Sequence, residues 1–298
     1  MKNWLSCLFV LSLCAGQAVA QGYSWDKVAP SCQILDKNQT PSYSVDLSYI
    51  ADSEFSGYDS SRFMELNASL ELGYYYDVLE GELDMALDFD GTWLLSSAGL
   101  QLPDQLVVLA LDAGLTWRYM NGVALQVRVA PGIYGDFEEV TIENWNMPIS
   151  VAGVKRFNSD VSAIAGVQVR FGFERELMPI VGVVWAPSDW LRIEATLPEA
   201  KAVYYFNDVW SGNVQWAWES MTYNIREKGD YDREKVTFES YRTSLGATYS
   251  ISDSLKLTGD IGMLRGRGVE FKRTADDMDN SIDISSEAFA RVGLAGPF

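Results

Sequence analysis

The amino-acid sequence predicts an all-β fold, an antiparallel transmembrane β-barrel of about twelve to fourteen strands. Three observations support this prediction. Apolar and polar residues alternate along most of the chain, and aromatic residues gather near the ends of the alternating segments. No stretch after the N-terminal segment approaches the ~20 continuous apolar residues of a membrane helix. A helical membrane protein is therefore excluded, whereas a barrel is not.

The clearest alternation lies in residues 62–89. Apolar side chains occupy every second position from Met64 to Tyr74 and again from Leu83 to Phe89, with mostly acidic or small residues between them. Since the side chains of a strand point to opposite faces with a period of two, each segment has one apolar and one largely acidic face. The two segments and the turn between them predict an antiparallel hairpin.

Residues 1–20 have the features of a signal peptide. Lys2 provides a positive start, an apolar stretch follows, and Ala18-Val19-Ala20 forms a small-x-small cleavage site. Residues 21–40 lack periodicity and are expected to form a periplasmic lead-in, and residues 41–298 are expected to form the barrel. Only Cys32 remains after cleavage, so the exported chain cannot form an intramolecular disulfide. We therefore expect export to the outer membrane of a Gram-negative bacterium.

The composition excludes several classes of function. The chain has 41 acidic and 23 basic residues and a net charge of -18, which argues against nucleic acid as a partner because phosphate binding needs basic clusters. It contains no histidine, which excludes catalysis by Ser-His pairs and makes a zinc site implausible. We therefore expect no enzymatic activity, no cofactor and no metal site. A carboxylate pair such as Asp84 with Asp88 stays open only in principle.

The alternating segments also predict the number of strands. About thirteen clear segments of ~10 residues can be counted, the length that a tilted strand needs to cross a bilayer. The positions of long loops and short turns agree from both ends of the chain only if residues 131–158 contain one more strand. Residues 137–142 could form a short strand there, whereas Met147-Pro148 breaks any longer one. This parity favours fourteen strands, or twelve if two weak segments fail.

Two features indicate that the apolar faces meet lipid rather than a protein core. Tyrosines and tryptophans lie near strand ends, as interfacial girdles require: Tyr43, Tyr49, Tyr74, Trp117, Tyr119, Trp185 and Tyr249. The chain ends on Phe298, in phase with Leu294 and Val292, which resembles the signal by which outer-membrane proteins are recognised for assembly. Outer-membrane lipid, lipopolysaccharide and the barrel-assembly machinery are therefore the expected partners.

A family resemblance adds to this prediction. The segments MPIVGVVWAP (residues 178–187), LPE (197–199) and YYFNDVW (204–210) resemble an uncharacterised bacterial outer-membrane β-barrel family, one of the families built on a domain of unknown function. The segment RGRGVEF (265–271) is similar to the penultimate segment of that family. The resemblance covers most of the chain after the signal peptide. It implies the barrel and its location, and it implies no catalytic residues.

The polar faces of the strands contain full charges, which we expect to line a lumen of mixed sign. The candidate lumen-lining residues are Arg118, Arg128, Arg170, Arg192, Arg242, Arg291, Asp84, Asp88, Asp112 and Glu194. Passive passage or binding of small polar solutes is the leading functional prediction. Two alternatives stay open. One is a structural or surface-interaction barrel whose lumen is closed by the same charges, and the other is an exported soluble β-protein.

Overall fold

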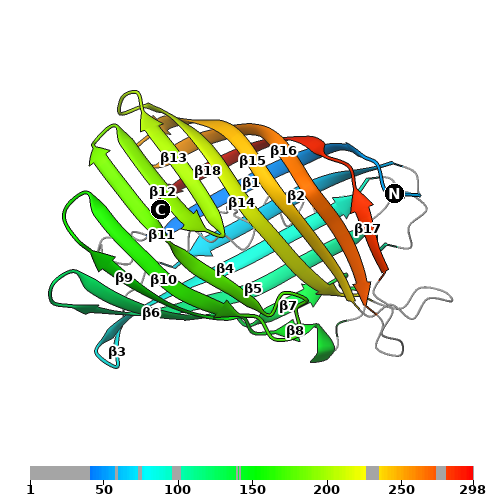
Figure 1. Cartoon of the computed structure of the whole chain (residues 1–298), viewed down its shortest axis with the longest axis horizontal. Helices are drawn as coiled ribbons and strands as arrows, with labels where there is room; N and C mark the ends of the chain where they lie inside the picture. Colours follow the sequence, from blue (N-terminus) through cyan, green and yellow to red (C-terminus); the bar gives the residue numbers. More distant parts are fainter. Residues whose placement is uncertain are drawn as a thin grey trace.

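The computed structural model describes residues 41–57, 60–72, 76–95, 102–138, 140, 142–225, 235–272 and 280–297, and most of them lie in strands. The predicted signal peptide and lead-in, with Cys32, lie outside the described residues, as do Tyr74 and Phe298. No helix in the described part of the chain is long and apolar enough to span a membrane. The strands form a single sheet that closes on itself as a barrel (Figure 1).

The sheet contains long strands and several short pieces. The strands are β1 (Ser42–Ser53), β2 (Ser61–Glu71), β3 (Tyr76–Val78), β4 (Gly81–Leu94), β5 (Gln105–Tyr119), β6 (Val123–Val129), β7 (Gly132–Gly135), β8 (Trp145–Asn146), β9 (Ile149–Arg156), β10 (Val161–Val169), β11 (Leu177–Ser188), β12 (Leu191–Leu197), β13 (Glu199–Tyr205), β14 (Trp210–Asn224), β15 (Lys235–Ser252), β16 (Leu255–Lys272), β17 (Asn280–Ile284) and β18 (Glu287–Pro297). One turn of 3-10 helix, η1, spans Ile142–Asn144.

Fourteen strand positions make up the closed wall of the described barrel. In ring order they are β1, β2, β4, β5, β6, β9, β10, β11, β12, β13, β14, β15, β16 and β18, and β18 pairs antiparallel with β1. The short strands β3, β7, β8 and β17 continue interrupted positions and add no new ones. Apart from an interruption beside β12 and β13, closure pairs each strand position on both sides, which a lipid environment requires because it offers no hydrogen bonds. The predicted barrel is confirmed, at the upper end of the predicted strand number.

Strand β9 is the additional strand that parity predicts within residues 131–158. It pairs antiparallel with β6 on one side and with β10 on the other. The prediction that residues 137–142 could form a short strand is wrong. Phe137 has a positive φ of 59°, which breaks an extended strand, and Ile142 begins the 3-10 turn η1.

The two ends of the barrel differ in their connections. At the short-turn end, tight turns join the strands, and both the start of β1 and the end of β18 lie there. One of these turns is Asn121-Gly122, with φ of 66° and 67°, which fits the type I′ hairpin that this dipeptide favours. The opposite end, which we call the long-loop end, holds the longer connections, among them residues 130–148 between β6 and β9.

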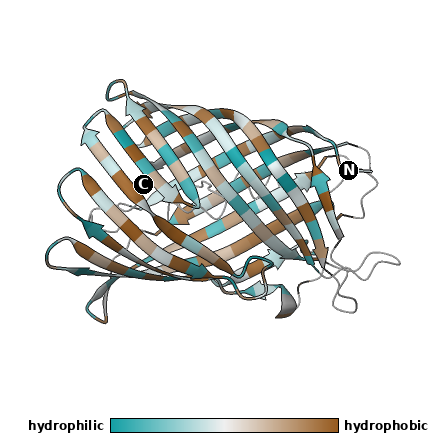
Figure 2. Ribbon diagram, in the orientation of Figure 1, coloured by the Kyte–Doolittle hydropathy of each residue, from teal (hydrophilic) through white to brown (hydrophobic). Residues whose placement is uncertain are grey.

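The outer face is apolar in a band between two rows of aromatic residues. Along β1, Leu47 is 42% exposed while the next residue, Ser48, is 0% exposed. Figure 2 shows apolar and polar residues alternating along the strands. Near the short-turn end the rings of Trp210 and Tyr249 lie 4.7 Å apart. Further along the same two strands, Trp216 stacks on Tyr241 at 6.0 Å. An apolar band flanked by aromatic girdles is the outer surface of a transmembrane barrel.

The interior at the long-loop end is filled by an apolar cluster, which we call the apolar plug. Its buried residues are Ile50, Phe55, Phe63, Leu102, Leu106, Val108, Ala110, Tyr134, Phe173, Tyr223, Ile225, Val236, Leu264, Val269, Phe271, Ile284 and Phe289. Strand β7 continues the position of β6 beside β5 and also pairs with β14 at Asn224, so it joins two parts of the wall that are distant in ring order. The charged lumen predicted from the sequence therefore occupies only part of the barrel, because the inward face becomes apolar near this end.

On the side of the long-loop end, β12 and β13 stop short of the neighbouring strands β11 and β14. Strands β12 and β13 form a hairpin that turns at Pro198, and the last strand hydrogen bond here joins Trp218 N to Pro198 O at 2.9 Å. Beyond it, residues 177–180 of β11 and 219–223 of β14 lack partners from the hairpin. We call this interruption the wall notch.

Candidate functional site

A cavity of ≈ 260 Å³ lies inside the barrel, and we call it the lumen cavity. Strands β1, β2, β4, β13, β14, β15, β16 and β18 supply most of its lining. Its roof is formed by Tyr134, Phe173 and Tyr223, which also belong to the apolar plug. The charged lining residues are Asp46, Glu65, Asp90, Glu199, Glu219, Asp260, Arg170, Lys201, Arg242 and Arg291. The cavity is therefore polar along its walls and apolar where it meets the plug.

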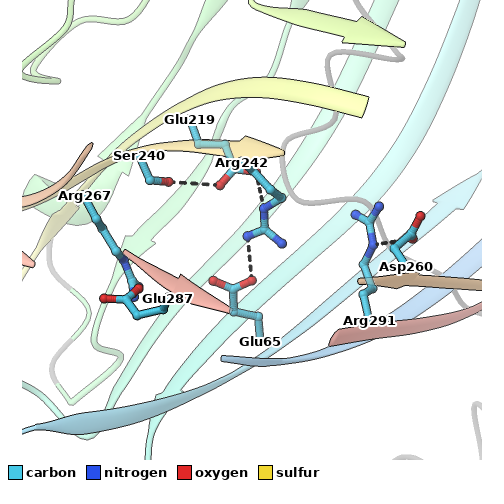
Figure 3. Close-up of polar contacts among 8 residues, drawn as sticks. All are labelled: Glu65, Glu219, Ser240, Arg242, Asp260, Arg267, Glu287 and Arg291. Atoms are coloured by element: carbon cyan, nitrogen blue, oxygen red, sulfur yellow. Dashed lines mark hydrogen bonds and ion pairs between the residues drawn. The ribbon is translucent and has the colours of Figure 1, made fainter. Parts of the chain in front are cut away.

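Arg242 of β15 is held between two carboxylates that come from different parts of the wall. Its Nη2 donates to Glu65 Oε2 at 2.9 Å, and its Nε lies 2.8 Å from Glu219 Oε1 (Figure 3). The guanidinium also lies 4.7 Å from the ring centroid of Phe289, at the edge of the plug. Because Glu65 is on β2, this pair reaches across the lumen and ties distant parts of the wall together.

A second ion pair lies nearer the short-turn end. Arg291 Nε donates to Asp260 Oδ2 at 3.0 Å, and Arg291 Nη2 donates to Gln215 Oε1 at 3.4 Å (Figure 3). The side chain of Asp260 is 6% exposed and that of Arg291 is 16% exposed. Both groups are thus withdrawn from bulk water. Away from water, two opposite charges attract each other more strongly than they do at the surface.

Arg267 lies closer to the long-loop end than these pairs, beside residues of the apolar plug. It pairs with Glu287 at 3.3 Å (Figure 3) and sits 4.3 Å from the ring centroid of Phe63. Gly266, with a φ of 55°, lies at the extra residue of a β-bulge between β15 and β16. The bulge changes the alternation, so that Arg267 is buried while Arg265 is exposed. Of these two arginines, only Arg267 lies inside the barrel.

A separate charge network lies on β4, β5 and β6. Arg128 donates from Nε to Asp112 Oδ1 at 2.6 Å and also pairs with Asp84. Arg118 pairs with Glu82 on the same part of the wall. None of these residues lines the lumen cavity as the structure describes it.

Two acidic side chains of the lumen cavity lie against glycines of neighbouring strands. Asp260 is opposite Gly246 and Asp46 is opposite Gly293 in the strand register. A Cβ atom added at either glycine would meet the carboxylate oxygen at 1.8 Å. The glycines therefore let these carboxylates lie close to the wall, which leaves the space in front of them open.

A family model described as "Domain of unknown function (DUF6268)" matches residues 112–294. The chain belongs to this family. The match includes the segments at 178–210 and 265–271 that resemble an uncharacterised barrel family, so that resemblance is confirmed. No curated protein matched the DUF6268 chain by sequence.

Solved structures similar to the DUF6268 barrel include porins and outer-membrane channels. The "KdgM porin" matches with a TM-score of 0.38 at 11% identity, over 86% of this chain and 99% of that chain. The COG4313 outer membrane channel from Pseudomonas putida F1 matches with a TM-score of 0.44 at 12% identity, over 88% and 96% of the two chains. The Pseudomonas putida toluene transporter TodX matches with a TM-score of 0.38 at 10% identity, over 95% of each chain.

The DUF6268 barrel places the sequence-predicted residues in two groups. Arg170, Arg242 and Arg291 line the lumen cavity. Arg118, Arg128, Arg192, Asp84, Asp88, Asp112 and Glu194 lie outside its lining; Arg192 pairs with Glu194 at 2.5 Å, and Asp88 is 4% exposed.

Sequence reasoning missed several lining residues of the DUF6268 barrel, namely Asp46, Glu199, Lys201, Glu219 and Asp260. Asp46 alternates with Val45 and Leu47, and Asp260 precedes Ile261, so the same two-residue period would have assigned both to the inner face. Glu219 alternates with Trp218 in the same way, whereas Glu199 directly follows Pro198 at the hairpin turn and has no alternation before it. No group of three or more His, Cys, Asp or Glu side chains among the described residues is arranged to hold a metal ion.

Proposed function

We propose that this barrel spans the bacterial outer membrane and admits small polar solutes to its lumen. The lumen cavity supports this function, since a barrel that served only as a scaffold would not need a charged space of ≈ 260 Å³ among its walls. Ligand pockets usually occupy about 300–1,000 Å³, so the solute would be small, about the size of an amino acid.

The wall notch supplies a route past the apolar plug. The plug closes the straight path from the long-loop end, whereas Arg170, Glu199 and Ser220 lie at the notch and also line the cavity. The notch begins at Trp218, near the aromatic row of Trp216 and Tyr241 on the side of the long-loop end. A solute that enters there therefore stays outside the hydrocarbon layer. Passage would continue through the cavity toward Thr248 and Thr258, near the short-turn end.

A structural barrel with a closed lumen is the second candidate. The observation that favours it is the pairing of buried charges, such as Arg242 with Glu65 and Arg267 with Glu287, beside the apolar plug. The first contact ties β15 to β2, the second joins the neighbouring strands β16 and β18, and both occupy space inside the barrel. The exposed apolar band, with Leu47, Leu87 and Leu245 among its members, does not suit a barrel surrounded by water, so a soluble protein is disfavoured.

We also propose how the protein reaches the outer membrane and which partners it meets there. A signal peptide in residues 1–20 would direct export, and the barrel-assembly machinery would insert the strands. The aromatic rows would then lie at the two lipid interfaces, with the long-loop end facing lipopolysaccharide. We propose no catalytic role for any side chain.

Conductance in planar bilayers and swelling of liposomes test the proposal. The purified barrel should give discrete current steps, and Ala295→Trp, at the cavity lining, should reduce them. Ala290→Trp is the matched control, because this residue is exposed on the outer face of the same strand. A folded barrel that gives neither current nor swelling would contradict passage and favour the closed-lumen barrel.

A further inference from the structure

Asp46 differs from the other acidic residues of the lumen cavity. Its side chain is directed into the cavity from β1, and the residue is only 9% exposed. No hydrogen bond or ion pair holds its carboxylate within the described part of the chain. Burying a charge without a partner is unfavourable, so a side chain of this kind suits a site that an external charge completes.

The two nearby arginines are already engaged by other acids. Arg291 pairs with Asp260 at 3.0 Å, and Arg242 lies between Glu65 and Glu219. The cavity lining holds six acidic residues and four basic ones, so acid remains in excess by two. The local balance of charge therefore favours the binding of a cationic solute over an anionic one.

The wall beside Asp46 leaves room for such a group. Gly293 faces Asp46 in the register, and its lack of a side chain lets the carboxylate lie close to the strand. Ser44 and Thr258, small polar residues, line the cavity as well. An ammonium or guanidinium group could donate hydrogen bonds to the carboxylate there and to the neighbouring hydroxyls.

We propose that Asp46 anchors the cationic end of a small organic solute in the lumen cavity. The solute class is a primary amine or guanidine of about amino-acid size. This inference rests on the proposed admission of small solutes to the lumen, and it adds the charge that the lumen selects. Asp260 and Arg291 beside the site would position the rest of the solute.

Calorimetric titration of the folded barrel in detergent tests the proposal with three probes. Putrescine carries two ammonium groups, 1,4-butanediol has the same length without charge, and succinate carries two carboxylates. We expect putrescine to bind at least tenfold more tightly than either of the others. Comparable binding of all three would overturn the proposal, and this comparison needs no variant.

Variants then locate the site. Asp46→Asn removes the charge without removing a hydrogen bond of the described barrel, and it should weaken putrescine binding at least tenfold. Asp253→Asn, in an exposed turn, is the control and should leave binding unchanged. Unchanged binding in Asp46→Asn would refute the assignment. Putrescine binding without current would refute passage alone, whereas current without preference for putrescine would refute the role of Asp46 alone.

Discussion

The guanidinium of Arg170 donates a 2.6 Å hydrogen bond from Nη1 to the backbone carbonyl of Ser220, across the wall notch. Ser220 lies in the part of β14 that lacks a partner from the β12–β13 hairpin. The same guanidinium donates to Arg175 O at 2.8 and 3.0 Å, which ties the β10–β11 connection to this contact. One side chain thus satisfies a strand carbonyl that a neighbouring strand would otherwise bind and holds the adjoining connection in place.

Replacing Arg170 by alanine should widen the route beside the notch. The loss of a charge-assisted hydrogen bond should cost about 1.5–3 kcal/mol of stability, and the removed side chain should increase single-channel conductance. Arg175→Ala is the control, because that exposed residue pairs with Glu239 on the outer surface and should change stability by less than about 0.5 kcal/mol. Equal currents in wild type and Arg170→Ala would show that the notch does not limit passage.

Removing Arg242 alone should be strongly destabilising. Arg242→Met leaves Glu65 buried without its partner, at an expected cost of about 3–5 kcal/mol in urea unfolding of the vesicle-inserted barrel. The double variant Glu65→Gln with Arg242→Met should recover most of this loss, because both buried charges are absent. A double variant as unstable as the single one would mean that packing of Arg242 against Phe289 matters more than charge.

A charge on the outer band should impair insertion. Leu66 is opposite Leu47 in the register and lies between the levels of Tyr43 and Tyr49, close to the middle of the band. Leu66→Arg should therefore cost about 2–4 kcal/mol and reduce the heat-modifiable, folded form on a gel. Leu95→Arg, beyond the end of β4 on an exposed leucine, should assemble normally. Normal assembly of both variants would contradict the assignment of the outer face.

The bulge at Gly266 should be sensitive to any side chain. Gly266→Ala places a Cβ in the left-handed region, at about 1–2 kcal/mol, and brings it within 3.0 Å of Tyr241. Gly268→Ala is a close control two residues away, since nothing lies within 4 Å of its added Cβ. Urea unfolding should separate the two variants. Equal stability would show that Arg267 does not depend on the bulge for its inward position.

The strand number and the outer face could be predicted because they depend on local patterns. A two-residue period identifies which residues share a face, and the parity of turns placed the unseen strand β9 between Pro131 and Asn158. The Asn121-Gly122 turn likewise depends only on two adjacent residues, which favour a type I′ hairpin. These features need no knowledge of which distant strands meet.

The plug, the notch and the charge pairs could not be predicted in this way. Glu65 and Arg242 are 177 positions apart, and their contact depends on how the ring closes. Ile50 and Phe63 occupy the same faces as polar neighbours, so the period alone assigned that whole face to a polar lumen. The bulge at Gly266 shifts the period by one residue, which reverses the faces beyond it.

The apolar plug is a core stabilised by the exclusion of water, and it lies inside a barrel whose outer surface contacts lipid. Lipid tails are as apolar as leucine, so strand association within the outer band gains little from water exclusion. Ile50 and Phe63, both 0% exposed, instead leave water when the long-loop end closes, at about 1.5–3 kcal/mol per side chain. That end should therefore weaken on cooling and in urea like a small soluble domain, while the band responds to bilayer thickness.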